Sequence, residues 1–470
     1  MVSGFSSGNI ELLLESYRSL EREPIRQLES RKSGIDNRIK LFNDLKSKLS
    51  ALSTLSKDLS YSGTTSFFGK KTASSSDEDY LTVTATSTAV ATSTSVFVNQ
   101  LAKADKVVSS QFTNTGTDIA TGLGAGTFNF DVTVNGVATP VSVLLDGTED
   151  NETLLGKVSS AVNNATGAGI RASIIKDSSS TSRMVFTSTE TGADYEMTLS
   201  DTSGGLLSAI GINDSVAANG TTGGYVYDTS ELNAIATIDG ITVTSNTNTL
   251  EDVVTGLTIS LKKQQEIGET PITVNAENDV EGIKEKLQEF IDAYNGVLDF
   301  IKTNTAVNTT TYERSAFSGD YSISTFKFQL RQIIATPITG LGVDDPSLLS
   351  ELGITTDRNG KLSISDADSL DDLIKNNISQ VEQIFNAADG ISGKLETLLD
   401  GMTDGEGIIT RRKQVLESQI TTMNSRIKLM ESSVDKKMDY YRTQFAQLQA
   451  AYAQYQSQYS YITALTQSSF

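Results

Sequence analysis

A heptad stripe of large apolar residues near the C-terminal end is the feature that most limits how this chain can fold. Between Arg411 and about Leu465 the sequence contains neither Pro nor Gly, and the apolar residues recur at alternating steps of three and four, with one extra step of four at Val434. This spacing predicts one long helix that keeps a single face against a partner helix, with a local unwinding of the supercoil at the extra step. At about 1.5 Å per residue the helix would extend roughly 80 Å, which is too long for a small globular core. The stripe comprises Leu416, Ile420, Met423, Ile427, Met430, Val434, Met438, Tyr441, Phe445, Leu448, Tyr452, Tyr455, Tyr459 and Ile462.

A second apolar stripe lies near the N-terminus. Helical spacing from Ile10 to Leu20 is followed by Pro24, which marks either a break or the first turn of a new helix. Beyond it, apolar residues recur seven apart at Leu28, Ile35, Phe42 and Leu49. We therefore predict that the two ends of the chain are partners in a coiled coil, and that both stripes are self-assembly seams.

The sequence between the stripes changes to strand patterns. A Ser/Thr-rich run from about Thr64 has the composition of a disordered linker, but its interleaved Val and Phe residues favour strands. Asn135-Gly136 and Asp239-Gly240 supply the positive φ angles of tight hairpin turns. Helical spacing returns at Asp279 and extends to about residue 305.

This order of elements predicts an α+β multidomain protein, in which β-rich domains are inserted between helical segments from the two ends of the chain. The predicted domains are a terminal coiled coil of residues 1–60 with 411–470, a mixed helical and β shaft of 61–105 with 275–410, a β-rich head of 106–126 with 225–274, and a second inserted β-rich head of 127–224. We expect residues 61–410 alone to stay folded but to lose assembly.

Composition and charge exclude several classes of function. The chain has no Cys and no His, which excludes cysteine–histidine zinc sites, thiol nucleophiles and Ser-His triads. The net charge is −20, and residues 61–410 hold 46 acidic but only 20 basic residues, which argues against binding to nucleic acid. No apolar run is long enough to insert into a membrane, and residues 1–24 lack the pattern of a cleaved secretory signal.

Three motifs have part of the pattern of a catalytic or metal site, but each fits a structural role better. The acidic residues from Asp366 to Asp372 lie at a predicted helix start, where the helix dipole favours them. Asp357-x-Asn359-Gly360 has part of a calcium-loop pattern but fits a hairpin turn better. The segment TGLGAGT lacks the strand and helix that frame a phosphate loop. We predict no catalytic residue, no metal and no cofactor.

The tyrosines from Tyr440 to Tyr461 admit two interpretations. They are either large amphipathic side chains of a coiled-coil interface, or a surface used between subunits, since Tyr is enriched at protein interfaces.

Several segments resemble one known family. STSVFVNQLAKADKVVS is similar to a strand motif with a central QLAKA, and NAIATIDGITVTSNTNTLEDVVTGLTISLKK, EFIDAYNGVLDFI, ELGITTDRNGKLSIS and the C-terminal TQFAQLQAAYAQYQSQYSYITAL resemble other segments of the flagellar filament-capping protein family, hook-associated protein 2 or FliD. IELLLESYRSLEREPIRQLESRKSGI resembles the family's N-terminal helix, and the residues from FNFDVTVNGV to YEMTLS resemble an insertion shared with flagellins.

The resemblance implies a structural protein that is secreted through the flagellar export channel. It would form a homo-oligomeric ring, usually described as a pentamer, at the filament tip and guide flagellin to fold and insert. Its implied partners are other copies of itself, flagellin, hook–filament junction proteins and a flagellar export chaperone. The N-terminal stripe is too short to cover the whole C-terminal one, so we expect the tyrosine-rich end to contact another subunit or the filament.

Two other functions remain as alternatives. The acidic β-rich heads would suit a surface adhesin, and the chain could be a different flagellar axial protein, either flagellin or a hook–filament junction protein. An enzyme such as a polysaccharide lyase is disfavoured because the chain contains no His and shows no carboxylate–aromatic cleft pattern.

Overall fold

The computed structural model describes residues 7–212 and 217–467, which divide into two units. The helical unit is Met1–Phe68 with Val280–Phe470, and the β unit is Gly69–Asp279. The elements of the helical unit are α1 (Ser7–Glu21), α2 (Glu23–Asp58), α6 (Val280–Thr305), α7 (Tyr321–Ala335), β17 (Ile354–Thr356), β18 (Leu362–Ile364), α8 (Ala367–Asn376), α9 (Ile378–Asn386), α10 (Ile391–Thr403) and α11 (Ile408–Gln467).

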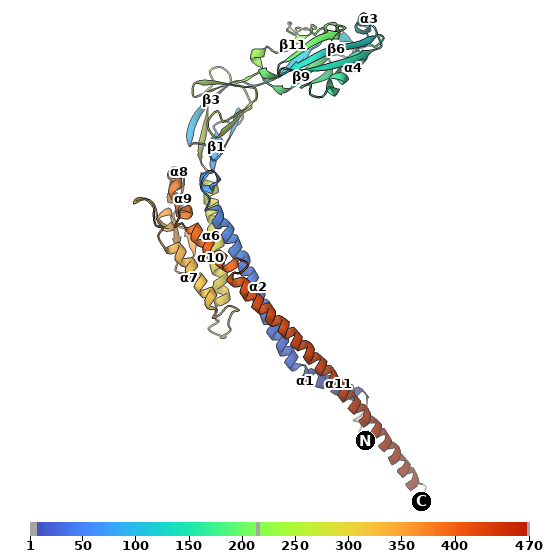
Figure 1. Ribbon diagram of the computed structural model, residues 1–470, viewed down its shortest axis with the longest axis vertical. Helices are drawn as coiled ribbons and strands as arrows, with labels where there is room; N and C mark the ends of the chain where they lie inside the picture. Colours follow the sequence, from blue (N-terminus) through green and yellow to red (C-terminus); the bar gives the residue numbers. More distant parts are fainter. Residues whose placement is uncertain (1–6, 213–216, 468–470) are drawn as a thin grey trace. The chain divides into compact units, whose positions relative to one another are not determined.

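The long C-terminal helix is confirmed as α11, which has 60 residues. Helices α1 and α2 meet at Arg22, and Pro24 occupies the first turn of α2, where its missing N–H leaves no hydrogen bond unmade. In Figure 1, α2 and α11 lie side by side. The ion pairs Glu11–Arg442, Arg18–Asp435 and Arg22–Glu431 run in opposite directions along the two ends of the chain. The predicted partnership of the chain ends is therefore an antiparallel one.

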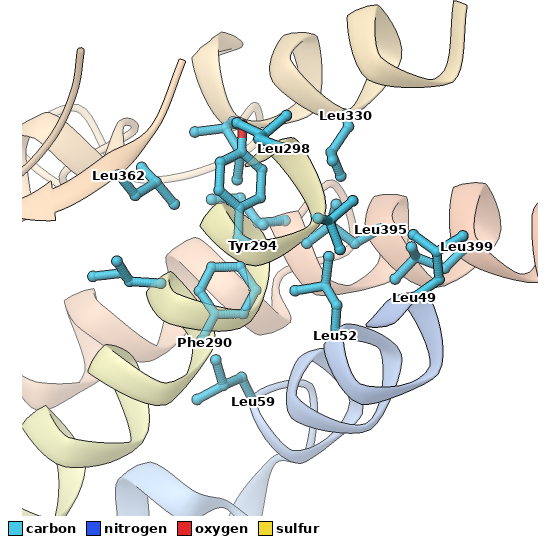
Figure 2. Close-up of a cluster of buried hydrophobic side chains, with 14 of the residues drawn as sticks. Leu49, Leu52, Leu59, Phe290, Tyr294, Leu298, Leu330, Leu362, Leu395 and Leu399 are labelled. Carbon is cyan, nitrogen blue, oxygen red and sulfur yellow. The ribbon is translucent and has the colours of Figure 1, made fainter. Parts of the chain in front are cut away.

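The C-terminal half of α2 belongs to a globular core rather than to a separate coiled coil. Figure 2 shows this cluster, in which side chains from α2, α6, α7, α10 and β18 meet. Burying one such Leu or Phe side chain stabilises the fold by about 1.5–3 kcal/mol. The labelled members are Leu49, Leu52, Leu59, Phe290, Tyr294, Leu298, Leu330, Leu362, Leu395 and Leu399.

This core corrects two predictions. Residues 1–60 do not form a domain with 411–470 alone, because Phe42, Leu45, Leu49 and Leu52 are at most 1% exposed within the core shared with α6 and α10. For the same reason a fragment of residues 61–410 would lack one wall of this core, so its helical part is not expected to stay folded.

The described residues of the β unit form two hydrophobic cores. One lies between two sheets, and the other lies between two sheets and a helix. The first core lies between a sheet of order β1-β16-β3-β12-β13 and a sheet of order β14-β15-β2. The strands are β1 (Lys71–Ser75), β2 (Leu81–Ala85), β3 (Thr92–Gln100), β12 (Ala234–Ile238), β13 (Ile241–Ser245), β14 (Thr249–Glu251), β15 (Leu257–Leu261) and β16 (Ile272–Asn278).

The second core of the β unit lies between a sheet of order β10-β6-β7, a sheet of order β11-β4-β9-β5 with β8 beside β9, and helix α4. The elements are β4 (Ala104–Val108), β5 (Phe112–Thr113), α3 (Asp118–Leu123), β6 (Gly126–Val134), β7 (Val137–Leu145), α4 (Asn151–Asn164), β8 (Ile170–Lys176), β9 (Thr181–Thr191), β10 (Met197–Ser203), α5 (Leu206–Ala209) and β11 (Gly224–Tyr225).

Both predicted hairpin turns of this unit are confirmed. Strands β6 and β7 pair up to Val134 and Val137 around Asn135 (φ 49°) and Gly136 (φ 72°). Strands β12 and β13 turn in the same way at Asp239 (φ 46°) and Gly240 (φ 85°). Positive φ at both central residues gives the turn a twist that matches the paired strands.

The predicted boundaries of the inner domains differ from the structure. Residues 61–105 were expected to join 275–410, but β3 pairs with β12, and residues 69–279 form one unit that ends before α6. Residues 106–126 were expected to join 225–274, but Val107, Ile119 and Ala120 are buried in the second core.

Candidate self-assembly surface

A small apolar cluster joins the N-terminal helices to the middle of α11. Ile25 of α2 is fully buried against Val434 and Met438 of α11, which are 5% and 7% exposed. Tyr17 of α1 stacks on Tyr441 with ring centroids 5.4 Å apart. Val434 is the position of the extra four-residue step, so the step falls where α11 passes the α1–α2 break.

Ion pairs beside this cluster join the N-terminal helices to α11 in an antiparallel register. Arg22 lies 3.4 Å from Glu431, Arg18 lies 3.3 Å from Asp435, and Lys437 donates to Glu21 at 2.7 Å. The hydrogen bond with Glu21 raises the pKa of Lys437. Because these side chains are largely exposed, the pairs contribute little stability and act mainly on orientation.

A buried carboxylate ties three helices together where α2 and α11 enter the globular core. Asp320, whose side chain is 2% exposed, caps α7 by accepting from the N–H groups of Ser322 and Ile323 at 3.1 and 3.5 Å. It also accepts from Arg38 of α2 at 3.3 Å and forms an ion pair with Arg412 of α11 at 3.8 Å. This junction was not predicted, because its members lie far apart in the sequence.

The predicted seam residues fall into three groups. Those that are buried are Phe42, Leu49, Leu416, Val434 and Met438. Those that are half-buried are Leu28, Ile35, Ile420, Met423, Ile427, Met430, Tyr441, Phe445 and Tyr452. Those that are exposed are Leu448, Tyr455 and Tyr459.

Two of the predicted seam residues have a different role from the one expected. Phe42 packs on Phe317 with ring centroids 4.6 Å apart, and Leu49 lies in the globular core, so neither is available to another subunit. Ile25 was missed as a contact residue because it falls outside the seven-residue repeat of the α2 stripe.

The last part of α11 presents a different surface. From Thr443 to Phe470 the sequence contains no charged residue. Within this stretch Leu448 is 47% exposed, Tyr455 76% and Tyr459 74%. These three side chains continue the heptad stripe and lie within about 40° of one another around the helix. From Thr443 to Gln467, α11 is thus an uncharged helix with a partly solvent-exposed apolar and aromatic stripe.

The described residues offer no site for metal chemistry. No group of three or more Asp or Glu side chains in 7–212 and 217–467 is arranged to hold a metal ion. Asp366 caps α8 by accepting from the N–H of Ser369, and Asp357 accepts hydrogen bonds within the β17–β18 turn. None of the helices described is both long and apolar enough to cross a membrane.

Comparison with known proteins places both ends of the chain in one family. Residues 6–105 match the model of the flagellar hook-associated protein 2 N-terminus, and residues 232–457 match that of its C-terminus. The chain belongs to the flagellar hook-associated protein 2 family. Members of this family are structural proteins of the flagellum, so the chain is not an enzyme.

Hook-associated protein 2 relatives align over nearly the whole chain. The A-type flagellar hook-associated protein 2 of Pseudomonas aeruginosa is 27% identical over 93% of this chain and 90% of its own length. The flagellar hook-associated protein 2 of Escherichia coli is 24% identical over 98% of this chain and 96% of its own length.

A solved structure supports the fold. The crystal structure of the D1-D2-D3 domains of the flagellar cap protein FliD from Escherichia coli matches with a TM-score of 0.60 and 23% identity, covering 80% of this chain and 99% of that chain. The α+β multidomain fold predicted from the sequence is confirmed.

Proposed function

We propose that this protein caps the distal tip of the bacterial flagellar filament and that filament elongation depends on it. Its membership of the hook-associated protein 2 family carries this proposal, and it places the protein outside the cell on the flagellum. As a cap, it promotes the folding and insertion of flagellin subunits that arrive at the tip.

The assembly contacts of the cap lie on the terminal helices. The stripe of α11 from Leu416 to Tyr441 is largely covered by the chain's own α1 and α2, whereas Leu448, Tyr455 and Tyr459 are exposed. The exposed stripe makes contacts between copies of the chain, or between the cap and the filament. The copies form a closed ring, for which the family resemblance suggests five subunits.

Other partners follow from the same role. A cap that sits on a growing filament contacts flagellin, and it succeeds the hook–filament junction proteins at the distal end. An export chaperone holds the chain before secretion. The acidic β unit contains 25 acidic and 10 basic residues, which suits a soluble surface. The family assignment favours the cap over the adhesin interpretation.

A deletion strain tests the function directly. Removing the gene should abolish motility and release unpolymerised flagellin into the medium. Expression of the full chain should restore motility and stop the release. Normal filaments in the deletion strain would contradict a capping role.

A further inference from the structure

A small pocket lies between α6, α7 and the β17–β18 turn, apart from the helix seams. Its volume is about 370 Å³. It is lined by Tyr294, Phe328, Arg331, Gln332, Ala335, Thr356, Asp357 and Gly360. The proposed assembly contacts do not use this pocket, yet three of its residues carry groups that bind ligands.

The hydroxyl of Tyr294 is buried without a partner. Tyr294 is 0% exposed, and its Oη forms no hydrogen bond with any residue that the structure describes. Figure 2 shows the ring extending from α6 toward α7, with the hydroxyl at its far end near Leu298. Burial raises the pKa of Tyr294, so the group is a neutral hydrogen-bond donor. A phenylalanine would fill the same space without leaving a polar atom unpaired.

Arg331 supplies a positive charge at the same place. A Cβ atom added to Gly360 would lie 2.3 Å from Nε of Arg331, so the arginine side chain lies directly on this buried glycine. Arg331 and Tyr294 line the same pocket. Burial raises the pKa of Tyr294, and the charge of Arg331 partly opposes that rise. Within the described part of the chain, the side chain of Arg331 forms no hydrogen bond or ion pair.

The nearby carboxylate of Asp357 accepts hydrogen bonds from its own turn. Its Oδ1 accepts from the N–H groups of Asn359 and Lys361, both at 2.8 Å, and its Oδ2 accepts from the side chain of Asn359 at 3.2 Å. The N–H of Lys361 is the main cause that keeps the pKa of Asp357 below its ordinary value. The donors of Arg331 therefore remain open to an incoming group.

We infer that this pocket binds an acidic side chain, Asp or Glu, on a peptide segment of a partner protein. The guanidinium of Arg331 would donate two parallel hydrogen bonds to the carboxylate, and the hydroxyl of Tyr294 would donate a third. Phe328, which is 67% exposed, precedes Arg331 by three residues and so lies on the same face of α7. It offers an apolar contact for the residue next to the acid, and a pairing of aromatic and arginine side chains is typical of protein interfaces.

A model peptide tests this binding on the full chain. The probe is the acetylated and amidated peptide SSDEDYL, the sequence of residues 75–81, in which an acidic run adjoins Tyr and Leu. Calorimetry should detect binding, and the peptide SSNQNYL, without carboxylates, should not bind. Arg331→Gln should weaken binding by about tenfold or more, and Tyr294→Phe by roughly three- to tenfold.

Arg358→Gln is the matched control, because Arg358 is an exposed arginine of the same turn that does not line the pocket. It should bind the peptide as the unaltered chain does, and circular dichroism should show that all three variants are folded. Equal weakening by Arg331→Gln and Arg358→Gln would overturn the inference, since it would indicate general attraction to positive charge.

Two further results would also overturn it. If Tyr294→Phe binds the peptide as tightly as the unaltered chain, the hydroxyl takes no part in binding. If sodium acetate binds as tightly as the peptide and with the same dependence on Arg331, the pocket is a site for small free acids rather than for a protein segment.

Discussion

Two stretches of α11 carry the same heptad stripe but have different surroundings. Between Leu416 and Tyr441 the stripe packs on α1, α2 and the globular core, and charged residues beside it pair with α1 and α2. Between Leu448 and Tyr461 the stripe is largely exposed, and no charged residue lies beside it.

The comparison indicates that the charged residues beside a heptad stripe help to tell which kind of partner covers it. The heptad spacing alone does not. A helix whose flanks stay in water keeps charged side chains there, and these can pair with a neighbour at little cost. Charged groups are depleted at the centres of interfaces because removing them from water is costly. The uncharged part of α11 from Thr443 to Gln467 therefore suits a helix that is enclosed by other subunits.

The largest effect on stability is expected within the packed stretch. Val434→Asp places a carboxylate without a partner against Ile25 and Met438, which should cost about 3 kcal/mol or more of the local unfolding free energy. Urea unfolding, followed by hydrogen exchange of α1 and α11 amides, would measure the loss.

The control for this substitution lies on the same helix. Val415 is 56% exposed, so Val415→Asp should change the unfolding free energy by less than about 0.5 kcal/mol. Equal losses in the two variants would mean that the α1–α2–α11 contact does not hold the packed stretch in place.

A smaller loss is expected at the end of the packed stretch, where Asp320 joins three helices. Asp320→Asn keeps an oxygen that can cap α7 but removes the charge that faces Arg38 and Arg412. We expect a loss of about 1–3 kcal/mol in denaturant unfolding. An unchanged midpoint would show that the two arginines are solvated rather than paired.

The helices and hairpins were predictable because their signals are local. The three- and four-residue spacing of apolar residues predicts α11. Asn135-Gly136 predicts a hairpin, because few other residue pairs adopt a positive φ at both positions of the turn. The partner of a stripe was less predictable. Phe42 and Leu49 keep the seven-residue spacing of a coiled coil but pack in a globular core, because spacing selects a face of the helix and not what covers it.

Pairing between distant segments could not be predicted from local patterns. Strand β3 pairs with β12 so that Val98 lies opposite Ala236, and nothing near either residue specifies the other. The predicted domains separate these two strands for this reason. Asp320 was missed for the same reason, since its role depends on arginines from α2 and α11.

The smallest effect is expected for the exposed ion pairs of the packed stretch. Lys437→Ala removes the pair with Glu21 but leaves the buried cluster of Ile25, Val434 and Met438 intact. The unfolding midpoint should stay within experimental error, and adding salt should not alter that result. A large drop would show that charge, rather than apolar packing, holds α1 on α11.

We propose that the exposed stripe of α11 is an assembly surface. The double variant Tyr455→Glu, Tyr459→Glu tests this proposal. Its control is Ala450→Glu, Ser457→Glu, which adds the same charge on the opposite face of the same stretch. Each chain is expressed in a strain that lacks the protein, and motility and flagellin in the medium are measured. Both variants should fold normally. The tyrosine variant should lose motility and release flagellin, and the control should keep near-normal motility. Full motility of the tyrosine variant would show that the exposed stripe of α11 is not an assembly surface.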